Sequence, residues 1–133
     1  MRFLLDTSAL LAHYRHESGA AAVQAIFEDD EADIFLASPS LAEFARRLHA
    51  LGVDDPTVRE TIDNYALLFT EIVPISATVA LGAYAISRQT EQRLPLIDAL
   101  IAAAAQSWDA VLVHRDDHMA AIPGDILQQQ LLG

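Results

Sequence analysis

Acidic residues follow the short hydrophobic runs of this 133-residue chain. Asp6 comes directly after the run RFLL, and Asp116 follows the run AVLV within a few residues. Glu43 lies shortly after a third run, in the first turns of a predicted helix. Carboxylates gathered in one place repel one another unless a cation neutralises them. Hard divalent ions meet that need, clamp phosphodiesters and activate water, so the chemistry these acids predict is that of a nuclease.

Strands and helices are predicted to alternate along the chain. The expected strands are Arg2–Leu5, Ile34–Ala37, Glu71–Ile75 and Ala110–Val113. The expected helices start with the run Leu10–Tyr14 and continue with Ser18–Glu28, Ser38–Leu51, Val58–Phe69, Thr78–Glu91 and Pro95–Ser107. Because parallel strands need crossover connections, this order predicts an α/β fold with a short, mostly parallel sheet of four to five strands and helices on both faces.

The predicted sheet indicates where the acids lie. In an open parallel sheet, ligands bind beyond the carboxyl ends of the strands. Asp6, Glu43 and Asp116 all follow strand ends in the sequence, so we expect them to share one edge of the sheet. Asp98 is predicted in the first turns of a helix, a position that does not by itself aim it at that edge.

Each acid also has a purely structural explanation, which the sequence leaves open. Asp6 is placed to cap a helix. Glu43 completes with Ser40 the S-x-x-E pattern of a capping box. Asp98 would gain from the dipole of its helix, and the pair Asp116–Asp117 is typical of a turn. The convergence of several acids on one edge is the reason to favour the metal-site interpretation.

Composition narrows the class of protein. The chain is 53% hydrophobic and 20% charged, which fits one domain over residues 1–133. Its apolar runs are far shorter than the roughly 20 residues that cross a bilayer, and no secretory signal is recognised, so we expect a cytoplasmic protein without a membrane span. The lack of cysteine excludes disulfides and thiol nucleophiles, and the lack of lysine excludes Schiff bases and phosphate-binding loops.

Polar residues near the acids are candidates for supporting roles. The hydroxyls of Thr7 and Ser8 could orient the carboxylates or a water molecule. The net charge of −11 disfavours non-specific binding of nucleic acid, so an RNA substrate would need local arginines. Arg46 and Arg115 are the predicted RNA contacts, because each lies close to an acid in the sequence, although surface arginines more often form weak ion pairs.

Four segments together resemble the PIN-domain ribonucleases, specifically the VapC-type toxins of bacterial toxin–antitoxin pairs. They are LLDTSALLA (Leu4–Ala12), SPSLAEFARRL (Ser38–Leu48), RLPLIDALIAAAA (Arg93–Ala105) and VLVHRDDHM (Val111–Met119). The resemblance runs essentially from end to end and implies a Mg²⁺-dependent endoribonuclease, with Mn²⁺ as a substitute ion. It implies that Asp6, Glu43, Asp98 and Asp116 are catalytic and that Asp6, Asp98 and Asp116 hold the metal.

The same resemblance implies partners. It implies a small VapB-like antitoxin, typically DNA-binding, whose tail occupies the active-site groove, and a homodimer within the toxin–antitoxin assembly. The acidity of the chain suits an arginine-bearing antitoxin peptide. The apolar helices before Asp30 and around Val58–Phe69 offer a groove for that peptide, although core packing explains most of their side chains.

The chain departs from the family pattern around its last acid. His114 and Met119 stand where a hydroxyl residue and an aromatic residue are common, so Asp117 could share the ligand role with Asp116. Imidazoles of His114 and His118 could also favour a transition metal. Two other functions therefore stay open: a catalytically silent PIN-like binding module, and a PIN nuclease of RNA maturation that has no antitoxin. The sequence favours neither one metal ion nor two.

Overall fold

A five-stranded, fully parallel sheet forms the centre of the computed structural model, which describes residues 1–133. Its strands are β1 (Arg2–Leu5), β2 (Asp33–Ala37), β3 (Glu71–Val73), β4 (Val111–His114) and β5 (Gln129–Leu131). The strand order is β3-β2-β1-β4-β5, and every neighbouring pair is parallel. The predicted α/β fold is thus confirmed.

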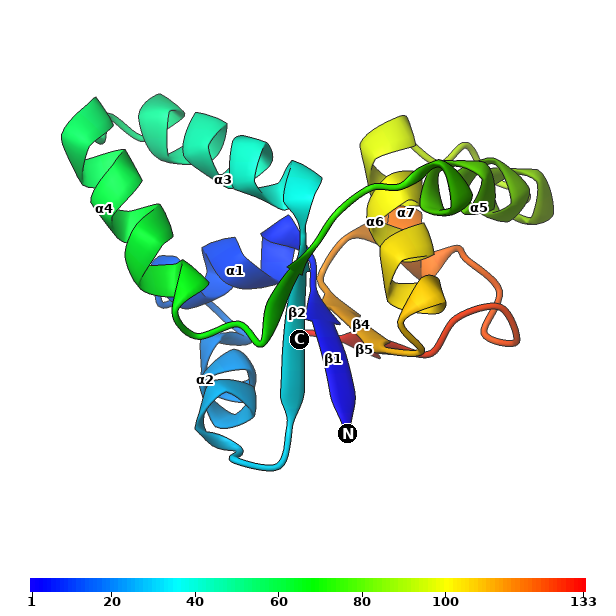
Figure 1. Ribbon diagram of the computed structural model, residues 1–133, viewed down its shortest axis with the longest axis horizontal. Coiled ribbons are helices and arrows are strands. Elements are labelled where there is room, and N and C mark those ends of the chain that lie inside the picture. Colours follow the sequence, from blue (N-terminus) through cyan, green and yellow to red (C-terminus); the bar gives the residue numbers. More distant parts are fainter.

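Helices cover both faces of this sheet. They are α1 (Thr7–Tyr14), α2 (Ala20–Glu28), α3 (Ser38–Ala50), α4 (Asp55–Ala66), α5 (Ala77–Gln89), α6 (Leu96–Ser107) and the short α7 (Asp117–Ala120). Figure 1 shows α1 to α4 on one side of the strands and α5 to α7 on the other. The right-handed crossover rule for parallel strands accounts for this distribution, because a reversal of direction along the sheet moves the connecting helices to the opposite face.

Each face of the sheet has its own hydrophobic core. Leu5 and the strand residues on the same face of the sheet pack against α1 to α4. Leu4 points to the other face, where it packs with the alanine-rich α6 and with α5. Side chains of a strand alternate between its faces, so a strand covered on both sides must be apolar throughout. This explains why the runs FLL and VLV carry no polar residue, and why the acids come only after them.

The register brings three strand ends to one edge. Leu5 of β1 pairs with Leu36 of β2 and with Val113 of β4. The backbone N–H of Asp6 donates to the carbonyl of Val113 at 2.9 Å, so β1 and β4 remain joined up to their carboxyl ends. The segments that leave these strands are therefore placed side by side.

Three elements differ clearly from the prediction: β5 and α7, which the sequence did not predict, and α4, whose bounds are shifted. Other element ends move by up to three residues, and β3 ends at Val73 rather than Ile75. The polar sequence of β5 gives no strand signal, but its backbone bonds extend the ladder of β4, with Leu132 N–H donating to the carbonyl of His114 at 2.8 Å. Helix α4 begins at Asp55 rather than Val58 and ends at Ala66 rather than Phe69. Its earlier start is explained by the Asp54 cap and the proline in the first turn, which together begin a helix rather than a simple turn.

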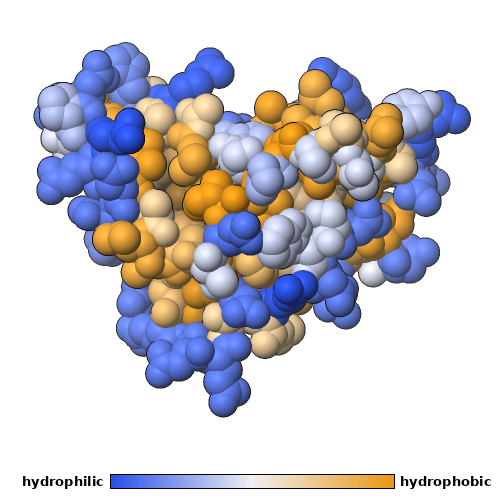
Figure 2. Space-filling model, in the orientation of Figure 1, coloured by the Kyte–Doolittle hydropathy of each residue, from blue (hydrophilic) through white to orange (hydrophobic).

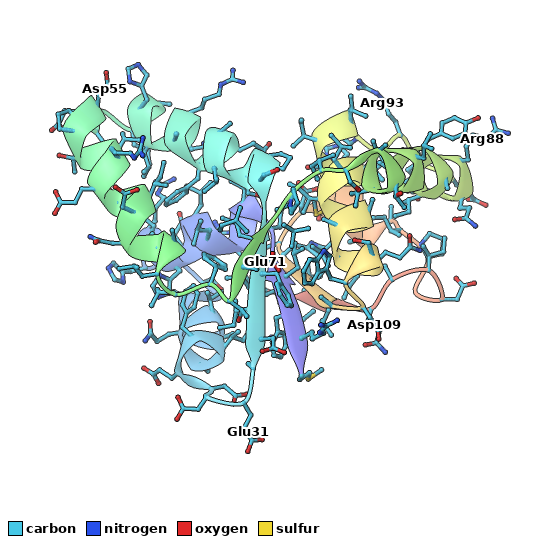
Figure 3. The ribbon with its side chains drawn as sticks, in the orientation of Figure 1. Glu31, Asp55, Glu71, Arg88, Arg93 and Asp109 are labelled. Atoms are coloured by element: carbon cyan, nitrogen blue, oxygen red, sulfur yellow. The ribbon has the colours of Figure 1, made fainter.

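The surface carries most of the charge and some apolar patches. Glu31, Asp55, Arg88 and Arg93 point outward from the extremities of the molecule in Figure 3. Figure 2 shows hydrophobic residues on this face on both sides of the molecule. No helix has the length and apolar character that crossing a membrane requires.

Candidate active site

A cavity of about 140 Å³ lies at the carboxyl edge of the sheet. Its lining consists of Asp6, Thr7, Ser8, Leu11, Glu43, Arg47, Asp98 and Asp116. All four acids predicted from the sequence therefore line one cavity, including Asp98, whose edge the strand pattern alone did not fix. They come from the cap of α1, from α3, from the first turn of α6 and from the cap of α7.

Asp6 is both a helix cap and a cavity residue. One carboxylate oxygen, Oδ2, accepts hydrogen bonds from the backbone N–H of Ser8 at 3.0 Å and from its hydroxyl at 2.5 Å. The residue is only 3% exposed. Burial raises the pKa of Asp6 above its ordinary value, the bonds from Ser8 oppose that change, and the charges of Asp116 and Glu43 add to it.

Glu43 is held from another helix. Its Oε1 accepts a hydrogen bond from the Thr7 hydroxyl at 2.7 Å, which ties α3 to the start of α1. The capping-box alternative is wrong, since α3 has no side-chain cap and the buried Ser40 hydroxyl has no hydrogen-bond partner at all. A capping box requires reciprocal bonds to backbone N–H groups at the helix start. Glu43 is thus directed toward the cavity instead of its own helix terminus.

Asp98 has a strongly raised pKa. Burial, followed by the negative charges of Asp116, Asp6 and Glu43, raises the pKa of Asp98 to about 7, and His118 opposes the change. The carboxylate forms no hydrogen bond to neighbouring groups that would compensate for its burial. A cation placed among these oxygens would remove both the repulsion and the desolvation cost.

The polar residues at and after the end of β4 have different surroundings. His114 is fully buried: its Nε2 pairs with Oε1 of Gln129 at 2.7 Å, and its Nδ1 accepts from the Asp116 N–H at 3.0 Å. Both nitrogens are occupied, so His114 is not available as a metal ligand. Asp117 is exposed in the first turn of α7 and does not line the cavity, whereas Asp116 does.

Asp116 and His118 stand together at the start of α7. Oδ1 of Asp116 accepts from the backbone N–H groups of His118 at 2.7 Å and Met119 at 3.3 Å. The His118 Nδ1 lies 3.3 Å from Oδ1 of Asp116 and 4.0 Å from Oδ2 of Asp98. Donor atoms of these three residues lie within 4.8 Å of one another, an arrangement that could hold a metal ion.

Arginines are placed differently from the prediction. Arg47 lines the acidic cavity, whereas Arg46 faces a separate hollow beside His49 and Asp55. The Arg115 guanidinium pairs with Glu17 at 2.7 Å and donates to the backbone carbonyl of Ser18 at 3.1 Å. The backbone N–H of Arg115 donates to the Ser8 hydroxyl at 3.1 Å. In the sequence Arg46 and Arg47 both lie one turn beyond Glu43, and the prediction chose Arg46, whereas Arg47 is the one that lines the cavity.

The donor set fits a hard divalent ion. Three carboxylates, from Asp6, Asp98 and Asp116, line a small cavity, and Glu43 adds a fourth charge at its side. Oxygen donors of this kind are the ones that Mg²⁺ and Mn²⁺ prefer. Burial, together with the neighbouring negative charges, raises the pKa of Asp6 and Asp98, so no protein group fully offsets the cost of ionising these carboxylates in the cavity.

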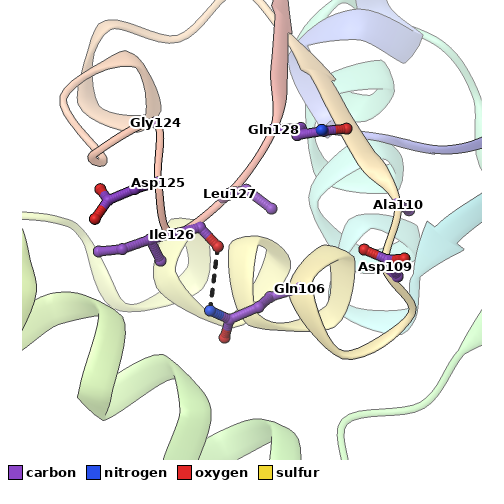
Figure 4. Close-up of a pocket in the computed structure, with 8 residues that line it drawn as sticks. All are labelled: Gln106, Asp109, Ala110, Gly124, Asp125, Ile126, Leu127 and Gln128. Carbon is purple, nitrogen blue, oxygen red and sulfur yellow. Dashed lines mark hydrogen bonds between the residues drawn. The ribbon is translucent and has the colours of Figure 1, made fainter.

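Two larger hollows carry no comparable chemistry. One, of about 260 Å³, lies at the opposite edge of the sheet between α6 and the segment before β5, where Gln106 donates to the Ile126 carbonyl at 3.3 Å (Figure 4). The other, of about 320 Å³, lies between α1 and α4 and is lined by His13, Tyr65 and Leu68 among others. Size does not identify the site here, because the smallest of these three cavities is the one that gathers four acids, two of them with raised pKa values.

Comparisons with known proteins point to one family. A family model described as PIN domain matches residues 3–125. No curated protein sequence matches the chain significantly. Among solved structures, VapBC2 from Rickettsia felis bound to a promoter DNA fragment is similar over all of both chains, with 19% identity and a TM-score of 0.78.

Two further structures show the same fold. A toxin–antitoxin complex from Klebsiella pneumoniae is 25% identical, covers 92% of this chain and 93% of its own, and has a TM-score of 0.66. VapC20 of Mycobacterium tuberculosis, described as a toxin that cleaves the Sarcin–Ricin loop, is 17% identical, with 90% of this chain and 94% of that chain covered and a TM-score of 0.67.

Proposed function

Because this chain belongs to the PIN domain family, we propose that it is a magnesium-dependent endoribonuclease and the toxin of a VapBC-type toxin–antitoxin pair. The observation that carries this proposal is the convergence of Asp6, Glu43, Asp98 and Asp116 on one cavity, two of them with raised pKa values. Gathering carboxylates that repel one another costs free energy of folding, and the fold itself does not require it. A bound cation explains why they are gathered.

In this proposal Asp6, Asp98 and Asp116 hold the ion, with Mn²⁺ as a substitute for Mg²⁺. When bound, such an ion polarises a phosphodiester and lowers the pKa of water, which provides a nucleophile at neutral pH. Ser8 fixes the Asp6 carboxylate, and the N–H groups of α7 fix Asp116, so both ligands are oriented before the ion arrives. Preorganisation of this kind reduces the cost of binding.

Glu43 takes a different role. The Thr7 hydroxyl donates to one of its oxygens, which leaves the other oxygen to accept a proton from the attacking water or to position it. The raised pKa of Asp98 belongs to the protein without its ion, and cation binding would return that carboxyl to its ionised form. The protein then presents a site whose charge is balanced only when the ion is present.

RNA has to approach a protein of net charge −11. Arg47 is the cation that lines the cavity, so we infer that it contacts a phosphate of the substrate. Arg46 and Arg115, the contacts predicted from the sequence, do not line this cavity, and Arg115 is paired with Glu17. Selectivity for one folded RNA would then come from the shape of its loops rather than from reading the sequence of a duplex.

The antitoxin is proposed to bind between α1 and α4. The hollow there is lined by His13, Tyr14, Tyr65 and the exposed Leu68, among others. Amphipathic helices dock in grooves of this kind, and a basic segment that continued toward the acidic cavity would compete with the cation. The surfaces that a homodimer would bury include exposed apolar residues of α5 and α6, namely Leu81, Tyr84 and Leu96.

The proposal is tested with the purified protein and total cellular RNA. We expect cleavage with Mg²⁺ and none with a chelator, with new RNA ends at a small set of positions. Cleavage that persists in the chelator would contradict the metal requirement. If the protein binds Mg²⁺ but cuts no RNA, the chain is a silent binding module. If it cuts RNA and no antitoxin gene neighbours its own, the RNA-maturation alternative is favoured.

A further inference from the structure

An exposed imidazole lies beside two of the carboxylates that line the cavity. The His118 Nδ1 lies 3.3 Å from Asp116 Oδ1 and 4.0 Å from Asp98 Oδ2, and its side chain is otherwise 60% exposed. Two donors that each lie about 2.1 Å from one ion, at an angle near a right angle, are about 3.0 Å apart. The distance from His118 to Asp116 therefore fits two donors of one ion, and the distance to Asp98 requires only a wider angle.

We propose that His118 adds a nitrogen donor to the cation site and that this donor tilts the site toward Mn²⁺ over Mg²⁺. The inference rests on the proposed metal site. Magnesium selects oxygen ligands, whereas the affinity of a site that includes a nitrogen donor rises along the first-row divalent metals, of which Mn²⁺ is the first. A site of carboxylates alone lacks this preference, so the ratio of the two affinities depends on His118.

The structure also admits a simpler arrangement, and it predicts the opposite sign. His118 could merely pair with Asp98 and Asp116 as a counter-charge. A counter-charge competes with the ion, so its removal would strengthen the binding of both metals together. A ligand supports the ion, so its removal would weaken Mn²⁺ selectively. The sign of the change in Mn²⁺ affinity therefore distinguishes a ligand from a counter-charge.

The experiment compares His118→Phe with His49→Phe. His49 is a matched control because it is also an exposed histidine beside an aspartate, with its Nδ1 3.9 Å from Asp55, but outside the cavity. Dissociation constants for Mn²⁺ and Mg²⁺ are measured by calorimetry without RNA, at pH 8 and again at pH 6, where a counter-charge would compete with the ion. We expect His118→Phe to weaken Mn²⁺ roughly tenfold and Mg²⁺ less than about threefold, a size usual for metal-site neighbours, and His49→Phe to change neither.

A spectroscopic measurement guards against indirect effects of the phenylalanine. Pulsed electron paramagnetic resonance of the Mn²⁺-loaded protein should show coupling to an imidazole nitrogen, which His118→Phe and His118→Gln both remove. Circular dichroism checks that the variants are folded; the substitutions keep the backbone N–H that bonds Asp116. Absence of nitrogen coupling in the wild-type protein, or equal changes for the two metals, would overturn the inference.

The failure of this inference is distinguishable from failure of the proposed function. If RNA cleavage needs Mg²⁺ but the Mn²⁺ affinity does not change when His118 is replaced, the nuclease proposal stands and the proposal of a nitrogen ligand is wrong. Selective Mn²⁺ binding through His118 without RNA cleavage leaves the metal site and removes the nuclease. A wild-type protein that binds neither ion overturns both.

Discussion

Helices α1 and α4 begin in the same way and end up with opposite chemistry. Asp6 and Asp54 both cap their helix with a carboxylate oxygen that accepts a backbone N–H, from Ser8 at 3.0 Å and from Thr57 at 2.9 Å. Yet burial raises the pKa of Asp6, whereas the bonds from Thr57 lower the pKa of the exposed Asp54. The capping pattern is thus common to both, and only the surroundings separate a structural acid from a candidate ligand.

The difference lies in the neighbours of each cap in space. Asp54 is exposed in the turn between α3 and α4, where one hydrogen bond is sufficient reason for an aspartate. Asp6 stands between β1 and β4 and faces the charges of Asp116 and Glu43. A cap alone would not justify burying a charge next to like charges, because serine or asparagine caps equally well without repulsion.

The largest predicted effect separates these two caps directly. Asp6→Asn keeps a capping oxygen but removes a negative ligand, so we expect Mg²⁺-dependent RNA cleavage to fall by at least about a hundredfold. Asp54→Asn should leave cleavage unchanged. Initial rates on a defined RNA measure both. Full cleavage by pure, folded Asp6→Asn protein would refute the assignment of Asp6 to the metal site.

A second prediction extends the comparison to the arginines that face the two regions. Arg47 lines the acidic cavity, and Arg46 faces the hollow beside Asp55 at the start of α4. Loss of one charged phosphate contact weakens binding by about tenfold, so Arg47→Gln should raise KM for RNA by that factor and Arg46→Gln should not. The reverse result would restore the residue predicted from sequence.

The third prediction concerns stability without metal. The pKa of Asp98 is raised to about 7 in the folded protein from 3.8, so between about pH 4 and 7 the folded state keeps a proton that the unfolded state has lost. The free energy of unfolding contributed by Asp98 therefore falls as pH rises through that window and is constant above it. Chemical denaturation in chelator across this range should show the decline, and Asp98→Asn should flatten it.

The smallest effect belongs to the exposed cap. Asp54→Ala removes the hydrogen bond to Thr57 and should lower the melting temperature slightly, with no change in RNA cleavage or metal affinity. Thermal unfolding beside a cleavage assay checks both parts. A loss of cleavage in this variant would mean that the start of α4 is coupled to the cavity, and the contrast between the two caps would fail.

The sequence is sufficient to predict the fold and to predict that three of the acids lie at one edge of the sheet. Buried strands are continuous apolar runs, and the residues that come after them are fixed at the carboxyl edge by the parallel register. Asp98 was harder, because its position depends on how α6 crosses the sheet and not on a strand end. The family resemblance, rather than the periodicity, indicated it.

Three other features could not be predicted, because the sequence pattern around each of them is ambiguous. Arg46 and Arg47 differ by about 100° around α3, so one step along the sequence moves a side chain from one hollow to another. The strand β5 has polar side chains and forms through backbone bonds to β4, for which its sequence has no pattern. His118 stood out in the sequence only as part of a histidine cluster, whereas the buried His114 of that cluster bonds Gln129 and has no nitrogen free for a metal.

The central position of β1 has a consequence for synthesis of the protein. β1 is made before its two neighbours, and one of them, β4, is made only after α6, while Asp116 comes after β4. A nascent chain that has left the ribosome only as far as α6 has three of the four acids and lacks the β4 carbonyl that holds Asp6 in place. The acidic cavity is therefore incomplete until β4 and the start of α7 have been made, because Asp116 lies between them.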